Sequence, residues 1–428
     1  MKSSLLVLTC VVIFSIIGFG QSNGLTQDLS HKFKKFTLNR LDSKDELDKV
    51  RAGKSITIKA DEKKLVLSLI VNDLRAANYK QIAKTPTGDI EFPRSLGGLT
   101  TFKGYVEGEN SSMVRLTLNG TKIEGLISIG NNSYYIEPAK NYSSSADAQD
   151  FVVYKDEDLL NRNEMPHSLV SKVKEGIRTT NEKFVNISYG GSPLKSLFRN
   201  NFVSSPTMDG TTYKVIRLLT DADVEYIADT PNQLPSYYPF QRRLQQTNDY
   251  INENLNIVQG VYERDALITF SIIAQTGHTA DPFGGSDVLG SFRGYWETSY
   301  PASGISLNRD LTILFSGQAA GGNSAYPGTI CNAPDFAYAI INGDYSFASY
   351  YEGWYRRGAL AHEIGHILGG SHVDDHPEWI NANPDCYNSI LGPLDPVTPQ
   401  YPIKICGFSV NQFQQHLATY NCLSTVTR

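Results

Sequence analysis

Apolar and amphipathic segments alternate through the second half of the chain, from residue 211 onward. Short apolar runs of the kind that form buried strands occupy 214–219, 266–274 and 310–315. Residues 239–258 instead carry apolar side chains at helical spacing, and residues 410–419 predict a short C-terminal helix. Strands that alternate with helices are typical of an α/β domain, so we expect residues 211–428 to fold around a mixed sheet.

Residues 21–155 show a different pattern, because strand-like segments follow one another without helical periodicity. Residues 65–71 form a short apolar run. Residues 112–119 and 122–129 alternate apolar and polar side chains, and Asn119-Gly120 between them is a turn signal. The pattern therefore predicts a β-rich N-terminal domain.

Between the two halves, residues 156–210 lack long apolar runs and are scattered with charged residues, Asn, Ser and Pro. Such a composition is typical of a linker, and we expect maturation, if it occurs, to take place here. The sequons for N-glycosylation lie in the first half of the chain, at Asn110, Asn119, Asn131, Asn141 and Asn186. This asymmetry indicates two parts with different surfaces.

The first 20 residues have the pattern of a secretory signal. Lys2 gives the positive start, residues 5–19 the apolar run, and Gly18 and Gly20 the small residues before a cut ahead of Gln21. An uncleaved membrane anchor is the alternative, but the run is short for a span. We therefore expect a secreted, extracellular monomer with no stable membrane anchor after signal cleavage.

Composition and charge narrow the class of protein further. The chain has 428 residues, of which 40% are hydrophobic and 19% charged, as in an ordinary globular protein. The formal net charge of −5 is small for this length and gives no reason to expect nucleic acid as a partner. Once the signal is removed, the cysteines are Cys331, Cys386, Cys406 and Cys422. An even number in a secreted chain indicates two disulfides, and three pairings are open.

The segment from His362 to His372 has the pattern H-E-x-x-H-x-x-G-x-x-H. His362 and His366 lie one helical turn apart on the same face, so both can reach a single zinc ion. Gly369 allows the helix to end in a left-handed turn that returns His372 as the third ligand. Glu363 lies beside that face, where it can reach a water on the metal as a general base. Three protein ligands leave the fourth position open, which indicates a catalytic zinc site.

The flanks of this segment fit a helix that is buried on one side, because apolar residues recur at helical spacing at Leu360, Ile364 and Ile367. We interpret the histidines outside this segment as structural residues rather than as metal ligands. We expect His376 at the surface, since a fourth protein ligand would close the site, His416 in the terminal helix, and His278 in a loop.

The extended zinc motif resembles the metzincin clan of metallopeptidases, and further segments are similar to its reprolysin (adamalysin-like) branch. Residues 219–223 (LTDAD) resemble the first strand and its exit, and residues 328–331 (GTIC) the approach to the zinc helix. In the first half, residues 104–108 (GYVEG) and 135–138 (YIEP) resemble the reprolysin propeptide. The resemblance implies an α/β metzincin catalytic domain, with a mixed twisted sheet, a zinc helix and a C-terminal helix, preceded by a β-rich propeptide domain.

The resemblance also implies roles for residues outside the motif. An edge strand above the cleft would bind extended substrate through Gly322, Asn323, Ser324, Ala325 and Tyr326. The implied disulfides are Cys331 with Cys422 and Cys386 with Cys406. The chain departs from the family at two positions. Leu391 stands where the clan has a methionine in the turn beneath the zinc, and Val373 follows the third histidine where reprolysins have aspartate.

These observations predict a secreted zinc metalloendopeptidase that hydrolyses peptide bonds in polypeptide substrates, with one catalytic Zn²⁺ and Glu363 as general base. The alternative is a catalytically weak or inactive secreted binding protein with the metzincin fold. A second alternative is that the first half is an independent domain rather than a propeptide. Since residues 21–213 contain no cysteine, latency would need steric cover or another ligand, such as a carboxylate or His167.

Overall fold

The computed structural model describes residues 24–94, 99–120, 122–160, 210–231, 233–285, 287–299, 308–318, 323–342, 352–376, 386, 389–392 and 403–428. Several predictions fall outside these ranges: the signal sequence of residues 1–20, most of the linker, His167, Asn186 and Gly322.

Within the described ranges, the N-terminal half forms an eight-stranded sheet in the order β1-β10-β9-β8-β7-β6-β3-β2. Its strands are β1 (Thr37–Arg40), β2 (Ile56–Ala60), β3 (Lys63–Val71), β6 (Thr101–Val106), β7 (Ser112–Leu118), β8 (Ile123–Ile129), β9 (Asn132–Pro138) and β10 (Asp150–Lys155). Every neighbouring pair is antiparallel. The three strands predicted in this half are present as β3, β7 and β8.

This sheet curls around a core of its own. The Asn39 side chain of β1 donates to the carbonyl of Lys59 in β2 (3.0 Å) and accepts from its amide (2.8 Å), so the two outer strands are joined. Helix α2 (Ser43–Arg51) buries Leu47 and Val50 against the same apolar cluster as β2, β3 and β7. Asp42 caps this helix by accepting hydrogen bonds from two backbone amides of its first turn.

The second sheet has the order β14-β15-β13-β11-β12-β4-β5, with β16 paired to β11. Its strands are β4 (Arg75–Thr85), β5 (Gly88–Phe92), β11 (Thr212–Ala222), β12 (Ile268–His278), β13 (Leu311–Ser316), β14 (Ser324–Ala325), β15 (Tyr338–Asn342) and β16 (Ser424–Thr427). The inner strands β15, β13, β11, β12 and β4 are parallel. Strands β14, β5 and β16 are antiparallel to their neighbours.

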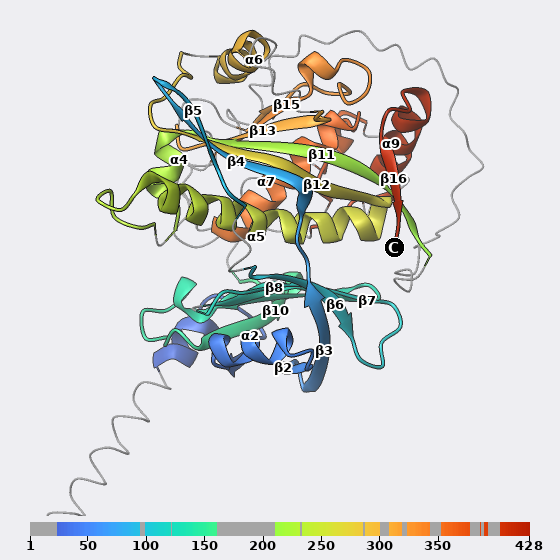
Figure 1. The fold of residues 1–428 in the computed structure, drawn as a ribbon. Helices are drawn as coiled ribbons and strands as arrows, with labels where there is room; N and C mark the ends of the chain where they lie inside the picture. Colours follow the sequence, from blue (N-terminus) through green and yellow to red (C-terminus); the bar gives the residue numbers. More distant parts are fainter. Residues whose placement is uncertain are drawn as a thin grey trace, which may run out of the picture.

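Two strands of this second sheet come from the N-terminal half of the sequence. The β4–β5 hairpin, residues 75–92, pairs with β12 although about 190 residues separate them along the chain. Figure 1 shows this blue hairpin beside the green and yellow strands of the upper sheet. The domain boundary expected near residue 155 is therefore crossed by a shared sheet.

The helices cover both faces of the second sheet, and they are α4 (Val224–Asp229), α5 (Phe240–Ala266), α6 (Val288–Ser299), α7 (Glu352–Ile367) and α9 (Gly407–Thr419). Helix α6 lies on one face, while α5 lies on the other face, between the two sheets (Figure 1). Within the described ranges, no helix combines the length and apolarity needed to cross a bilayer. The observed fold is thus a mixed α/β structure, as predicted, in which the N-terminal sheet contacts the far side of α5.

The predicted elements of the C-terminal half are present, and α5 continues beyond the expected end at residue 258 to Ala266. The prediction for His278 was wrong. Instead of lying in a loop, His278 is the last residue of β12 and is buried, with its Nε2 3.0 Å from Asp221 Oδ2. The strand continues through polar residues because buried partners satisfy them.

Candidate active site

Helix α7 positions the first two histidines of the motif. Leu360, Ile364 and Ile367 are buried in the core, as their helical spacing predicts. This apolar stripe holds the helix against the sheet, so that His362 and His366 project from the helix on the side of the site. Tyr262 of α5 donates a hydrogen bond to the Ala361 carbonyl (2.7 Å) and fixes α7 from behind.

The helix ends where the sequence predicts. Gly369 has φ +87°, a left-handed conformation that glycine adopts readily. Its amide donates to the His366 carbonyl (2.8 Å), and the Gly370 amide donates to the Gly365 carbonyl (2.9 Å). A side chain at residue 369 would also meet the ring of His416, 3.1–3.2 Å from an added Cβ. The turn brings His372 back to the other two histidines.

The three imidazoles converge on one point. The Nε2 atoms of His362 and His366 are 2.9 Å apart, and that of His372 lies 3.1 Å from each. Ligands about 2 Å from a tetrahedral zinc lie roughly 3.3 Å from one another, so the observed spacing fits a single ion. Among the described residues, these three histidines form the cluster suited to a metal, and His376 is half-buried outside it.

Backbone carbonyls fix the orientation of two of the rings. His362 Nδ1 lies 2.6 Å from the Ile390 carbonyl oxygen, and His366 Nδ1 lies 2.8 Å from that of Gly370. Because a carbonyl can only accept, each Nδ1 carries the proton and each Nε2 keeps its lone pair for a metal. Burial, and then repulsion from His372, lowers the pKa of His366 to about 3, and the pKa of His362 is also well below its usual value. The rings are therefore neutral, as metal ligation requires.

Glu363 supplies the remaining chemical group. Its side chain is buried, and Oε2 has no hydrogen-bond partner within the described part of the chain. Burial raises the pKa of Glu363 to about 8. A buried carboxylate oxygen without a protein partner is unusual, and here it fits a group that receives a proton from a bound water.

Leu391 and Val373 occupy the turn beneath the site. Both side chains are fully buried, and the Val373 amide donates to the Leu391 carbonyl (2.8 Å). A Cβ built on Gly365 of α7 would lie 3.3 Å from the Leu391 methyl groups. Leucine thus fills the space under the helix, and the core surrounding residue 373 suits an apolar side chain.

The structure describes only part of the segment that is predicted to bind substrate. Ser324 and Ala325 form β14, antiparallel to β15 at the end of the sheet, while Gly322 lies outside the described residues. The segment that follows is attached to the zinc helix, because the Gly328 amide donates to the His366 carbonyl (2.8 Å) and the Ile330 amide to the Ile367 carbonyl (3.2 Å). The edge strand therefore adjoins the three histidines.

Both disulfides of the structure are the pairs that the resemblance implies. Cys331–Cys422 links the segment after β14 to the chain end, and Cys386–Cys406 closes the loop that contains Leu391. Of the described sequon asparagines, Asn110, Asn131 and Asn141 are exposed. Asn119 instead donates its side-chain amide to Glu253 of α5 (3.2 Å), a contact that a glycan on that nitrogen would displace.

The sequence did not point to one residue of the site, Gln412 of α9. Its Oε1 accepts from the Ser371 amide (3.2 Å) and its Nε2 donates to Ser371 Oγ (2.8 Å), so it holds the residue next to His372 from both sides. Glutamine is common on helix surfaces, and no local pattern distinguishes this one. Only the fold brings residues 371 and 412 together.

Comparison with known proteins agrees with this geometry. Residues 248–373 match the reprolysin-like metallopeptidase family M12B. This segment includes the three histidines, so this part of the chain is similar to the reprolysin-like metallopeptidases of the metzincin clan, as the motif predicts. Such a family acts on polypeptides and uses a metal, typically zinc.

Two solved structures show only distant likeness. The structure of a chaperone–substrate complex is 12% identical over 37% of this chain and 24% of that one, with a TM-score of 0.28. Metalloproteinase-II from Bacteroides fragilis is 11% identical over 85% of this chain and 91% of that one, with a TM-score of 0.36. TM-scores as low as these do not indicate a function. Among curated proteins, none matches the chain.

Proposed function

We propose that this protein is a secreted zinc metalloendopeptidase with the metzincin arrangement of its catalytic domain. The observation that carries the proposal is the convergence of three imidazole Nε2 atoms, next in sequence to a buried Glu363 carboxylate oxygen that has no hydrogen-bond partner among the described residues. His362, His366 and His372 would hold the metal. When bound, zinc lowers the pKa of a water from about 16 to about 7 and polarises a carbonyl.

The chain's own residues would carry the remaining steps. Glu363 would accept the proton of the attacking water and then pass it to the amine that leaves when the peptide bond breaks. Its buried position favours this role, because a carboxylate oxygen without a hydrogen-bond partner among the described residues is free to accept that proton. The carbonyls of Ile390 and Gly370 would keep the imidazoles correctly turned throughout.

Substrate would bind along the sheet edge. Strand β14 is the outermost strand of the described sheet, and its residues Ser324 and Ala325, with Asn323 and Tyr326, can pair with an extended polypeptide. The link from Gly328 to the His366 carbonyl would place that polypeptide close to the metal. Binding through backbone groups implies an endopeptidase that accepts internal segments of a chain.

Secretion is supported by the N-terminal signal pattern and by two disulfides, which persist in oxidising compartments. We further propose that the protein is made as a proenzyme that is cut within residues 156–210.

A direct assay tests the function. The protein, cut within residues 156–210 if required, should cleave a denatured protein substrate. A zinc chelator should abolish this activity, and added Zn²⁺ should restore it. An intact substrate after prolonged incubation with zinc-loaded protein would refute the proposal and favour an inactive binding protein.

A further inference from the structure

The β4–β5 hairpin is an integral part of the sheet that carries the site. Strand β4 pairs in parallel with β12, with Gln275 opposite Gln81, Gly277 opposite Ala83 and His278 opposite Lys84. Strand β12 therefore has a hydrogen-bonded neighbour on each side, β11 and β4. Removing the hairpin would expose a row of backbone donors and acceptors along β12.

Side chains of the hairpin also enter the C-terminal core. Tyr79 is buried and donates a hydrogen bond to Gln275 Oε1 of β12 (3.0 Å). The buried Lys84 ammonium lies 5.3 Å from the centre of the Trp296 ring and forms an ion pair with Asp89 at 2.7 Å. Tyr79 belongs to the same apolar cluster as the residues of α5 and α7. Strand β4 is thus packed as an internal strand of the second sheet, and β5 forms its edge.

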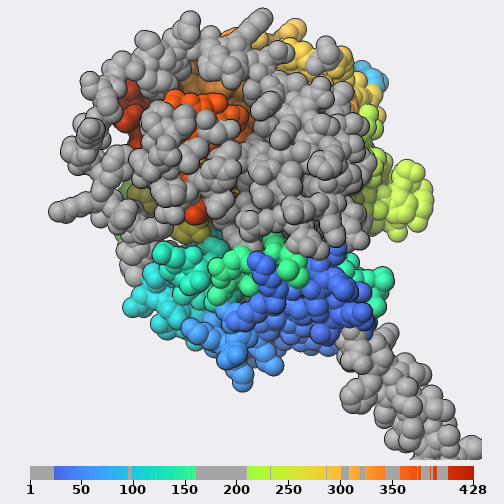
Figure 2. Space-filling view, turned by 180° about the vertical axis from the view of Figure 1, so that it is seen from behind, coloured from blue at the N-terminus to red at the C-terminus, as the bar shows by residue number. Residues whose placement is uncertain are grey.

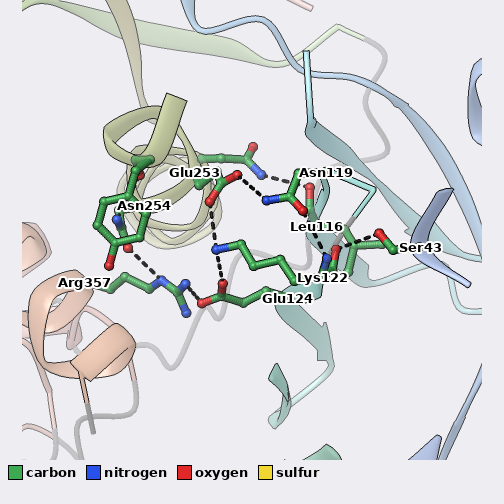
Figure 3. A network of polar contacts seen from close by, with 10 residues as sticks. Ser43, Leu116, Asn119, Lys122, Glu124, Glu253, Asn254 and Arg357 are labelled. Carbon is green, nitrogen blue, oxygen red and sulfur yellow. Dashed lines mark hydrogen bonds and ion pairs between the residues drawn. The ribbon is translucent and has the colours of Figure 1, made fainter. Parts of the chain in front are cut away.

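A second contact joins the N-terminal sheet to the helices behind the site (Figure 3). Lys122 forms ion pairs with Glu124 and with Glu253 of α5, each at 2.8 Å. Glu124 in turn pairs with Arg357 of α7, whose Nε donates to Asn254 (3.1 Å). The side chains of Glu124 and Arg357 are 8% and 2% exposed. Buried charges of this kind are stable only while their partners remain in place.

A third contact lies further along α5. Burial opposes ionisation of Glu263, but Arg115 of β7, with Arg428, holds the pKa of Glu263 below its usual value. The Arg115 side chain fits against Gly260, where an added Cβ would lie 2.5 Å from Arg115 Cγ. This close approach requires glycine at residue 260, although glycine is unfavourable inside a helix. Asn72 adds hydrogen bonds to Asn256 and Gln259 at 2.8 Å each.

None of these contacts blocks the site within the described residues. The hydrogen bonds and ion pairs of His362, His366 and His372 are to one another or to residues of the C-terminal half. Seen from behind, most of the blue-to-green residues of the N-terminal half gather at the lower end of the molecule, and a small blue patch lies beside the yellow residues at the upper right (Figure 2). The N-terminal half holds the back of the catalytic sheet and helices, so it need not leave for the site to open.

We propose that residues 24–160 remain bound as a permanent, noncovalent subunit after the chain is cut within residues 161–209. The partner of the surface formed by β12, α5 and α7 is therefore the chain's own N-terminal half. The recognition is by strand pairing on one side and by buried ion pairs on the other. Processing would then nick the protein rather than release a propeptide. This inference does not depend on peptidase activity.

The test uses the full-length protein with a recognition sequence for an added site-specific protease placed between residues 161 and 209. The Glu363→Ala background prevents self-cleavage. After cutting, both pieces should co-elute in gel filtration in native buffer and separate only in denaturant. Separate elution in native buffer, or precipitation of either piece on cutting, would overturn the proposal.

A matched pair of variants tests the interface itself. Gly260→Ala should improve the helix propensity of α5 but push the Arg115 side chain out of its contact, so the two pieces of the cut protein should separate at a lower denaturant concentration. Gly294→Ala in α6, where an added Cβ meets no atom within 4 Å, should leave that concentration unchanged. Separation of both variants at the same denaturant concentration as the unsubstituted protein would show that the α5 surface does not hold the N-terminal piece.

Discussion

Replacing Leu391 by alanine should destabilise the protein by about 4 kcal/mol, near the upper end of the range for buried leucines. The Leu391 side chain is 0% exposed and lies beneath α7. Its neighbours there include Gly365 and Gly370, where an added Cβ would lie 3.3 Å and 2.4 Å from Leu391 Cδ1. Because glycine has no side chain that can move into the vacated space, the cavity should stay open and the full cost should be felt.

Leu391→Met is the matched control. Methionine has a similar volume, so its cost should be below about 1.5 kcal/mol. Both variants and the wild type would be unfolded by denaturant in the metal-free form, so that loss of metal does not contribute to the difference. The free energies then follow from the shift of the midpoint at a common slope. Leu391→Ala within about 1 kcal/mol of the wild type, or Leu391→Met as unstable as Leu391→Ala, would refute the reasoning from volume.

Three further predictions follow from the surroundings of the site. Gln412→Ala should weaken zinc affinity by roughly tenfold in a chelator competition, because it frees the turn that carries the third ligand, whereas Gln415→Ala on the exposed side of the same helix should not. Replacing Cys331 and Cys422 by serine should lower the free energy of unfolding by about 4.6 kcal/mol, since the disulfide restricts a loop with a separation of 91 residues in the unfolded chain. A loss near zero, measured by thermal unfolding, would contradict this. Burial lowers the pKa of His416, so folding favours its neutral form. Below about pH 6.5 the free energy of unfolding of the wild type should therefore fall, relative to that of His416→Gln, by up to about 1.4 kcal/mol per pH unit. Free energies of unfolding that change in parallel with pH in the two proteins would contradict the lowered pKa of His416.

The cluster of three histidines could be predicted from the sequence because its determinants are local. All three histidines lie within one helix and the turn after it, and Gly369 marks the turn itself. The strands at 214–219, 266–274 and 310–315 and the helices at 239–258 and 410–419 were also predictable, since each is a short apolar run or carries apolar residues at helical spacing. The role of Glu363 as a base stays a prediction from its place beside His362 in the motif.

Other features depend on contacts that no local pattern encodes. Strand β4 (RAANYKQIAKT) is rich in Ala, Lys and Asn, which are depleted in strands, so its pairing with β12 is decided by the fold. Gln412 acquires its role only because α9 packs near residue 371. The loop predicted for His278 is wrong because a distant residue, Asp221, satisfies its ring inside the sheet.

The central claim is that three histidines bind a zinc ion and that Glu363 uses it for hydrolysis. The most direct measurement compares zinc content and cleavage of a denatured protein for the wild type and Glu363→Gln. Both should bind one zinc ion per chain, and the variant should cleave at least about 100-fold more slowly. Cleavage by Glu363→Gln at the wild-type rate, or no cleavage by the zinc-loaded wild type, would contradict the account.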